Sequence, residues 1–492
     1  MNSNFKKITA LLLLLALLIP TFAACAGGDT DTGSADTTAA VTTATPEDTT
    51  PSLEELYPIP EMNYDGREFN MMILRTGYWG QDYNDLYIEE DTGDAVDSAL
   101  VSRNRRVEET AGVKLTSTET AAVVGDISRL IKADDSTYEM VQDQAVSIMP
   151  SMASTGLLHD ITTIEGITLD APWYNQKAHD SVTLSGKLFM LGGDATASDK
   201  QGTAVVMFNK KLAEDFNIPD IYTIVEEGKW TLDTMAEYAK AVTADINGSS
   251  ELDMDDRFGL IAEDFFGWNF LIASGCKIAE KDENDLPYFT AYNDRSMTVL
   301  EKIQNIMYDE NIRGNAIKGG TWEAENYEIV FGENRALFHA NVLSTIAGYR
   351  NMESDFGIIP QPKFDEAQED YITTISPFVS RFLAFPINNG DTEFIGNVVD
   401  LLARFGTDTV KSAYYDVLLT SKVARDDASE RMLSLIFDSI TYDVGSIFNW
   451  GNCWFIYQQH FTAKKDNFSS TWASIEKAAN KQIEKTIEKI TE

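Results

Sequence analysis

Short apolar runs alternate along the chain with stretches in which apolar residues keep helical spacing. Residues 69–74 form an apolar run rich in strand-forming side chains, and Asp94 can cap a helix that begins soon after it. Gly112 is placed to stop this helix before a second strand at residues 113–117. A strand, a helix and a strand in this order predict a βαβ unit with parallel strands.

The next segments continue this pattern. A helix is expected at residues 127–132, a strand at 138–141 and a further helix at 148–158. Two polar or aromatic pairs follow predicted strands, Tyr78 with Trp79 and Asp143 with Gln144. Open α/β sheets bind ligands beyond the carboxyl ends of their strands, so both pairs are candidates for ligand contact.

The second half of the chain is predicted to hold further strands, and then mostly helices. Thr231 can cap a helix with a single apolar face, and beyond Glu393 the pattern is mainly helical up to an amphipathic C-terminal helix. The further strands are expected at residues 186–191, 204–208, 335–339 and 356–359. The alternation of strands and helices indicates the α/β class.

The first 25 residues have the pattern of a lipoprotein signal. Lys6 and Lys7 precede an apolar run of about a dozen residues, which is too short to span a membrane well, and small residues lead to Cys25. Residues 1–24 are therefore expected to be a signal peptide, with Cys25 as the lipid acceptor. Phe22 departs from the leucine that is usual in this motif, and simple secretion is the alternative.

Residues 25–57 are expected to be a tether, because they are rich in Thr, Ala, Gly and Asp and lack periodic apolar positions. About 440 residues follow, more than one hydrophobic core usually supports, so two lobes are expected. No later segment has the length and apolarity of a transmembrane helix. The chain is expected to lie outside the cell, anchored to the membrane only through its lipid.

The chain is strongly acidic, with a net charge of -39. This charge excludes nucleic acid as a partner and disfavours anionic ligands, so a neutral or cationic ligand fits better. Solubility outside the cell is the alternative explanation of the acidity. Besides Cys25 the chain has only Cys276 and Cys453, which are expected to be buried free thiols, with a disulfide between them as the alternative.

A degraded calcium loop occupies residues 245–256. It matches an EF-hand loop at its first, third, ninth and twelfth positions, whereas serine replaces the carboxylate at the fifth and the glycine at the sixth. No cofactor is expected to be required. Bound Ca²⁺ remains one hypothesis and an acidic surface turn the other, and the candidate ligands are Asp245, Asn247, Ser249, Asp253 and Asp256.

From residue 69 onward the order of motifs resembles the extracellular solute-binding proteins of ABC importers, in the carbohydrate-type subgroup with the type II periplasmic-binding-protein fold. Each motif is weak alone, and their shared order carries the resemblance. The motifs are YEMV at 138–141, STGLLHDIT at 154–162, GKLF at 186–189, MFNK at 207–210, GKWTLD at 228–233 and GIIPQPK at 357–363.

This resemblance implies two α/β lobes with a ligand cleft between them, a helical C-terminal region and closure about a hinge. The first lobe is expected to take residues 58–195 and about 383–440, and the second about 196–382 and 441–492. The chain crosses between them near residues 192–202 and 382–386. Its partners would be a carbohydrate and the membrane subunits of a permease, and the protein would be a monomer.

Sugar binding needs flat aromatic faces for the rings and carboxylate or amide groups for the hydroxyls. For each aromatic the alternative is core packing, and Asp194 could instead cap a crossover loop. The candidates for stacking are Tyr78, Trp79, Trp268 and Trp322, and those for hydroxyl binding are Asp143, Gln144, Asp194 and Asn341.

The sequence therefore predicts a lipid-anchored receptor, not an enzyme, that delivers a carbohydrate, expected to be an oligosaccharide, to an ABC importer. A secreted carbohydrate-active enzyme is the first rival, although no G-x-S-x-G or H-E-x-x-H motif is present. A surface sensor or adhesin with the same fold is the second. The long polar tether favours a Gram-positive type of envelope, because a lipid anchor retains the receptor near its permease.

Overall fold

The computed structural model of the chain describes residues 52–75, 86–314, 324–349, 351–420, 427–462 and 467–492. Backbone contacts divide the chain into two units, Met1–Ile59 and Pro60–Glu492. The described part of the first unit holds one short helix, α2 (Leu53–Leu56), which begins with a capping box between Ser52 and Glu55. All elements named below belong to the second unit.

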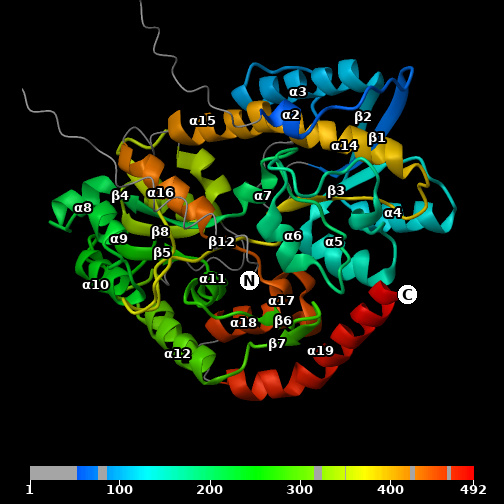
Figure 1. The fold of residues 1–492 in the computed structure, drawn as a ribbon. Coiled ribbons are helices and arrows are strands. Elements are labelled where there is room, and N and C mark those ends of the chain that lie inside the picture. Colours follow the sequence, from blue (N-terminus) through cyan, green and yellow to red (C-terminus); the bar gives the residue numbers. More distant parts are fainter. Residues whose placement is uncertain (1–51, 76–85, 315–323, 350, 421–426, 463–466) are drawn as a thin grey trace, which may run out of the picture. The chain divides into compact units, whose positions relative to one another are not determined.

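The first sheet contains the predicted βαβ unit (Figure 1). Strand β1 (Arg67–Leu74) pairs in parallel with β2 (Val113–Thr120), and α3 (Ala95–Ala111) connects them. Asp94 caps α3 by accepting the backbone N–H of Val96 at 2.9 Å, and Gly112 ends it with a φ of 65°. The βαβ prediction is confirmed, with both helix ends at the expected residues.

Two further strands complete this sheet, in the order β11-β3-β1-β2. Strand β3 (Met140–Gln144) is parallel to β1, whereas β11 (Arg381–Ala384) returns from far along the chain and pairs antiparallel with β3. Helix α14 (Thr392–Gly406), which follows β11, contacts α3, and α4 (Val123–Lys132) contacts both β1 and β3. Segments that are more than 200 residues apart in the chain therefore share one sheet.

The second sheet has the order β5-β8-β4-β9. Strand β8 (Ala336–Val342) is parallel to β5 (Phe258–Ala262), while β4 (Ala204–Asn209) runs antiparallel to β8 and to β9 (Phe356–Ile359). Every residue of β4, β5 and β9 is buried, as expected for strands with both faces covered. The predicted strand at residues 356–359 has the same bounds as β9.

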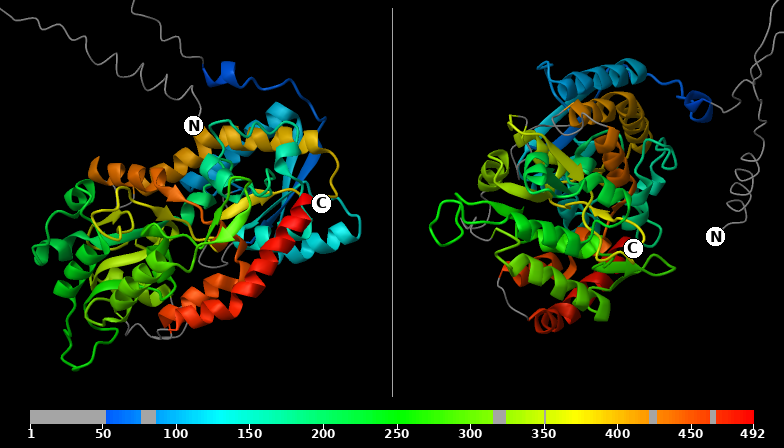
Figure 2. Two further views of the ribbon diagram at one scale, coloured as in Figure 1. Left: turned by 60° about the horizontal axis from the view of Figure 1, so that its bottom comes forward. Right: turned by 90° about the vertical axis from the view of Figure 1, so that its left-hand side faces the viewer.

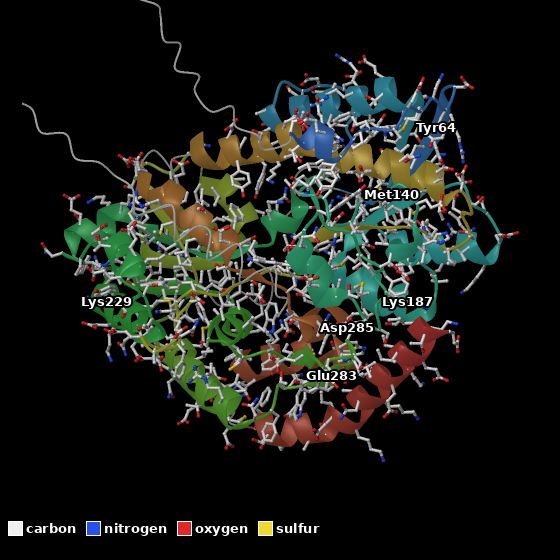
Figure 3. All side chains as sticks on the ribbon, viewed as in Figure 1. Tyr64, Met140, Lys187, Lys229, Glu283 and Asp285 are labelled. Atoms are coloured by element: carbon white, nitrogen blue, oxygen red, sulfur yellow. The ribbon has the colours of Figure 1, made fainter. Side chains whose placement is uncertain are left out.

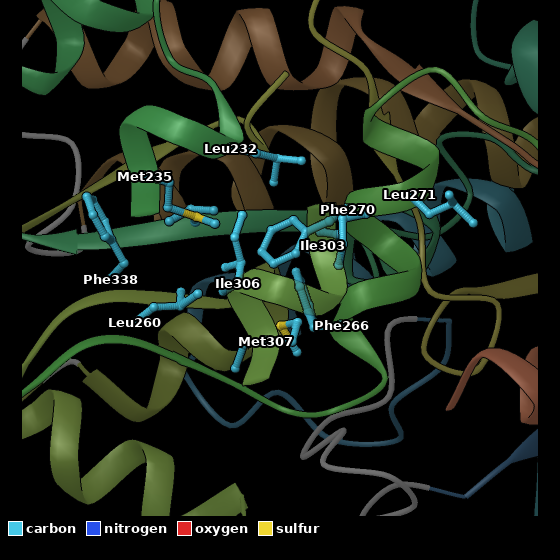
Figure 4. Close-up of a cluster of buried hydrophobic side chains, with 14 of the residues drawn as sticks. Leu232, Met235, Leu260, Phe266, Phe270, Leu271, Ile303, Ile306, Met307 and Phe338 are labelled. Atoms are coloured by element: carbon cyan, nitrogen blue, oxygen red, sulfur yellow. The ribbon is translucent and has the colours of Figure 1, made fainter. Parts of the chain in front are cut away.

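Helices α10 (Leu232–Val242), α11 (Phe266–Ala273) and α12 (Asp294–Tyr308) contribute to the hydrophobic core on one face of this sheet (Figure 4). Thr231 caps α10 as predicted, by accepting the backbone N–H of Thr234 at 3.2 Å. Trp230 is fully buried, and its indole N–H donates to the Pro360 carbonyl at 2.9 Å. This bond joins the start of α10 to the end of β9.

Two small strand pairs lie outside the large sheets. Strand β10 (Thr373–Thr374) is parallel to β12 (Ile440–Thr441), and β6 (Ala279–Lys281) is antiparallel to β7 (Pro287–Phe289). The remaining helices include α5 (Ala145–Ser151), α6 (Gln176–Val182), α7 (Ser198–Gln201), α8 (Lys210–Asp215), α9 (Ile221–Glu226), α13 (Ala324–Gly332), α15 (Ser412–Thr420), α16 (Asp427–Asp438), α17 (Val444–Phe448), α18 (Cys453–Thr462) and α19 (Phe468–Thr491).

The C-terminal region is helical, as predicted, and ends in the long helix α19 (Figure 2). Its buried side chains include Ala479, Ile483 and Ile490 from the predicted apolar face. Lys187 donates to the Ile490 carbonyl at 2.5 Å, which holds the end of α19 against the segment before β4 (Figure 3). Among the described residues no helix is long and apolar enough to cross a membrane.

The helix expected at 127–132 begins earlier, at Val123, and the strand expected at 138–141 is shifted to Met140–Gln144. Two predicted elements differ more strongly from the structure. Residues 186–191 do not form a strand, because their backbone makes only isolated bridges, such as Leu191 with Leu383 of β11. The helix expected at 148–158 begins earlier and breaks earlier: α5 ends at Ser151, and a 3₁₀ turn follows up to Gly156, which has a φ of 71°. Pro150 inside α5 lacks the N–H that a longer helix would use.

Candidate functional site

Asp143 and Gln144 lie where predicted, at the carboxyl end of β3. The Asp143 carboxylate is 4% exposed and accepts the backbone N–H of Gln144 at 2.7 Å. Burial raises the pKa of Asp143 to about 6, although the charge of Arg381 on the neighbouring strand β11 pulls in the opposite direction. The end of β3 thus holds a carboxylate with little solvation.

Arg381 organises this end of the first sheet. It is 1% exposed, and its guanidinium donates to the Leu74 carbonyl at 2.9 Å, which is the last residue of β1. The segment that follows β1 carries Tyr78 and Trp79, which lie outside the described residues. Arg381 therefore fixes the strand end from which these two aromatic residues continue.

The Gln144 side chain leads to an aromatic cluster. Its amide donates to the Phe378 carbonyl, and the Phe378 ring lies 4.5 Å from the Trp454 ring, centroid to centroid. Phe265, which follows β5, is 6.1 Å from Trp454. All three aromatic side chains of this cluster are half-buried. Contacts thus run continuously from the end of β3 in the first sheet to the end of β5 in the second.

Charged side chains gather at the carboxyl end of β5. Arg313 is 3% exposed, and its guanidinium donates to the carbonyls of Ala262 at 3.0 Å and Met307 at 3.1 Å and to the Asp264 carboxylate. Burial raises the pKa of the neighbouring Glu263 to about 7, the negative charge of Asp264 adds to this rise, and Arg313 opposes it. Glu263, Asp264 and Arg313 thus form a charged group at a strand end of the second sheet. Asp143 and Arg381 form such a group in the first sheet.

Asn341 lies near the carboxyl end of β8, the strand beside β5. Its amide nitrogen is 3.2 Å from Nε2 of His339, and its oxygen accepts the backbone N–H of Val342 at 2.8 Å. Burial lowers the pKa of His339 to about 3, so the imidazole is neutral, and its other nitrogen lies 2.7 Å from the Tyr349 hydroxyl. These contacts orient the amide of Asn341.

Two other predicted ligand contacts, Asp194 and Trp268, are buried and contact other parts of the protein. Asp194 is 4% exposed, and its carboxylate is 2.9 Å from the Lys411 ammonium and accepts the Thr407 hydroxyl at 3.0 Å. Trp268 is 1% exposed on α11, a helix that is buried on all sides. Core packing, the alternative stated for Trp268, matches its placement, whereas Asp194 lies in an ion pair with Lys411. Trp322 and the lipid acceptor Cys25 lie outside the described residues.

The acidic loop at residues 245–256 uses its carboxylates to bind its own backbone. Asp256 accepts the backbone N–H groups of Ile246 and Asp253, both at 2.8 Å, and Asp245 accepts those of Gly248 and Ser250. In the part of the chain that the structure describes, no three acidic, His or Cys side chains are placed to share a metal ion. The loop is thus a hydrogen-bonded acidic turn in this structure.

Both described cysteines are buried free thiols. Burial raises the pKa of Cys276 to about 11 and that of Cys453 further still. The expected free thiols are confirmed, and the disulfide alternative is wrong for this structure.

Sequence comparison gives no assignment, because neither a protein-family model nor a curated protein matches the chain. Solved structures do match. UspC from M. tuberculosis is similar with a TM-score of 0.56 at 12% identity, over 84% of this chain and 100% of the other. The maltose/maltodextrin-binding domain of Bdellovibrio bacteriovorus bound to maltotriose gives 0.52 at 16%, over 86% and 98%.

An ABC substrate-binding protein from Listeria monocytogenes in complex with cycloalternan gives a TM-score of 0.51 at 11% identity, over 87% of this chain and 98% of the other. At such low identities the likeness shows the fold. The chain has the two-lobed α/β fold of the solute-binding proteins of ABC transporters, with a helical C-terminal region. The resemblance found in the motifs is therefore confirmed at the level of the fold.

The aromatic cluster of Phe265, Phe378 and Trp454 was not predicted from the sequence. These residues come from three segments that are far apart in the chain, and none of them follows a predicted strand. It also missed Glu263 and Asp264, for which a signal does exist: residues 258–262 are an apolar run, and the two acids follow it directly.

Proposed function

We propose that this protein is a lipid-anchored carbohydrate receptor that delivers an oligosaccharide to an ABC importer. The observation that carries the proposal is the line of contacts from Gln144 through Phe378 and Trp454 to Phe265, which joins the strand ends of the two sheets. Such a site offers half-buried aromatic faces for sugar rings, and carboxylates and amides for hydroxyl groups. Several proteins of similar fold were solved with bound sugars.

A ligand held between the two sheets would contact both lobes only in a closed state. Its binding energy would then shift the population toward that state, which a permease can distinguish from the open one. Carbohydrate binding needs no catalytic group. If a purified sample released reducing ends from the sugar that it binds, the enzyme alternative would replace this proposal.

The first test is direct binding. Isothermal titration of the purified chain against maltodextrins, cello-oligosaccharides, chito-oligosaccharides and xylo-oligosaccharides should yield at least one ligand, with a rise in melting temperature. Absence of both signals across a broad glycan panel would refute the carbohydrate proposal.

Trp454→Ala is expected to weaken binding of that sugar about 10- to 100-fold, because it removes the central ring of the aromatic cluster; this corresponds to about 1.4 to 2.7 kcal/mol. Phe455→Ala is the matched control, since Phe455 is the next residue on α18 and is 45% exposed. Titration of both variants with the same sugar measures the difference. Equal affinities would show that the cluster is not part of the site.

The lipid anchor has its own test. In a Gram-positive host the wild-type chain should appear in the membrane fraction and incorporate labelled palmitate, whereas Cys25→Ser should lose the label and pass into the medium. A diacylated cysteine holds a protein persistently because each buried CH₂ contributes about 0.8 kcal/mol. Retention of the Cys25→Ser variant on washed membranes would refute the anchor at this residue.

A further inference from the structure

Two segments that connect the two sheets meet side by side. One leads from α7, which contacts β11 of the first sheet, into β4 of the second, and the other, residues 360–380, leads from β9 back to β11. The backbone N–H of Ser376 donates to the Gly202 carbonyl at 2.7 Å, and Thr203 forms a β-bridge with Ile375. These four residues form the pivot of the two sheets, because a rotation of one sheet relative to the other bends both segments.

Polar side chains at the pivot are buried without a full set of partners. Thr203 and Gln361 are fully buried, and Gln201, which directly precedes the pivot, is 2% exposed. The Gln361 side chain accepts the backbone N–H of Thr374 at 3.4 Å, which places it beside the pivot. Among the described residues, the Thr203 hydroxyl and the amide nitrogens of Gln201 and Gln361 have no hydrogen-bond partner.

Asn269 of α11 lies against the same connecting segment. A side chain at Gly275, beyond the end of α11, would touch Ile372, whereas Phe378 lies in the aromatic cluster with Phe265, before the start of the helix. The segment therefore follows α11 along its length, and α11 contacts β10 between these two points. Residues i and i+4 lie on one face of a helix, so Asn269 shares a face with Phe265. Asn269 is fully buried, and neither atom of its amide has a partner in the part of the chain that the structure describes.

The unpaired groups of Gln201, Thr203, Asn269 and Gln361 disfavour the packed pivot. About nine in ten buried polar groups of folded proteins have a partner. A polar group that leaves water without gaining a partner costs free energy, so the packed arrangement is disfavoured relative to one in which water reaches the group. Movement of the connecting segment away from α11 would let water reach Asn269. The cost is therefore concentrated where the two sheets are joined.

We propose that these unpaired groups are an opening device built into the pivot. They destabilise the packed pivot and keep the free protein in exchange with a second arrangement, in which the connecting segment has separated from α11 and water solvates the polar groups. A ligand that binds only the packed arrangement must supply the difference in free energy between the two. The proposal rests on the fold and is independent of the carbohydrate function.

Two variants of the full chain test the device without any ligand. Asn269→Leu and Thr203→Val each replace an unpaired polar group by an apolar group of similar size. Hydrogen–deuterium exchange with peptide mass spectrometry then follows the peptides that cover residues 372–380. The backbone N–H of Ser376 lies in these peptides and exchanges when its bond to Gly202 opens.

Each variant is expected to slow the exchange of the pivot peptides about 10-fold, because the packed arrangement no longer buries the unpaired group. The melting temperature of the unliganded chain should rise by about 1 to 2 °C.

Two matched controls carry the same substitutions at buried side chains that do have partners. Asn209 is fully buried, accepts the backbone N–H of Leu212 at 3.0 Å and donates to the Asn334 side chain at 2.7 Å. Thr231 is 4% exposed and caps α10. Asn209→Leu and Thr231→Val should lower the melting temperature and should not slow exchange at the pivot.

Two results would overturn the proposal. A lower melting temperature for Asn269→Leu and Thr203→Val, as in the controls, would show that bound water or another partner satisfies these groups in the packed protein. A higher melting temperature with unchanged exchange of the pivot peptides would show that the unpaired groups destabilise the fold as a whole and do not open the pivot.

Discussion

Arg313→Met is expected to lower the free energy of unfolding by about 2 to 4 kcal/mol, because the buried guanidinium satisfies two backbone carbonyls and pairs with Asp264, whose side chain is 34% exposed. The guanidinium holds the carbonyls of Ala262 and Met307 and the Asp264 carboxylate, and methionine satisfies none of them. Urea unfolding at pH 8 measures the loss.

The loss should depend on pH. The folded-state pKa of Glu263 is about 7, above its unfolded value, so its ionisation lowers stability as the pH rises from about 4 to 7. The positive charge of Arg313 holds the folded-state pKa of Glu263 below the value that burial alone would give it. Removing Arg313 therefore raises this pKa further. We therefore expect a smaller loss at pH 5, where Glu263 is protonated in the folded state, than at pH 8.

Arg106→Met is the control, because Arg106 pairs with Asp408 at 2.9 Å on the surface, where its side chain is 41% exposed. It should cost no more than about 1 kcal/mol at either pH. Equal losses in the two variants would mean that the group at the end of β5 is solvated like a surface pair.

Asp143→Asn is expected to make the protein more stable at pH 8 and a weaker sugar binder. The folded-state pKa of Asp143 is about 6 against about 4 when unfolded, so the folded state holds its proton more tightly, and stability falls as the pH rises through this interval. Asparagine stays neutral at every pH. The variant should therefore be about 1 to 3 kcal/mol more stable than the wild type at pH 8 and almost equally stable at pH 4.

The substitution also removes the negative charge that faces Arg381. This loss reduces the gain in stability and accounts for the lower end of the expected range. Sugar affinity should fall about 10-fold or more, because an amide offers fewer acceptors for hydroxyl groups than a carboxylate does. Urea unfolding at pH 4, 6 and 8, together with titration of the sugar, gives both quantities. A variant that is less stable than the wild type at pH 8 would show that Asp143 mainly serves to neutralise Arg381.

The sequence predicted those parts of the fold that depend on local patterns. Asp94, Gly112 and Thr231 mark helix ends through their own side chains or backbone, so three ends were located correctly. Trp230, which directly precedes the cap Thr231, and Trp472, on the C-terminal helix, are both buried.

The pairing of strands that are far apart in the chain has no such local pattern in the sequence. Nothing in residues 381–384 indicates that they pair with residues 141–144, because a strand of four buried residues looks alike wherever it pairs. The same limit explains the candidate site. Asp143 was placed by the rule for strand ends, whereas Trp454 and Phe378 meet only through the tertiary fold. Trp268 lies on α11, where residues 266–273 are mainly apolar and all buried, so its surroundings match core packing, the alternative stated for it.

Strand β11 lies far after β3 in the sequence, and this affects how the protein folds. Until residue 384 has emerged, β3 is an open sheet edge with unpaired backbone groups, and such edges attract other chains. The first lobe therefore cannot complete its sheet as an early, independent unit. A fragment that ends before β11 should aggregate or exchange strands, and the slow step of refolding should be the docking of this distant strand.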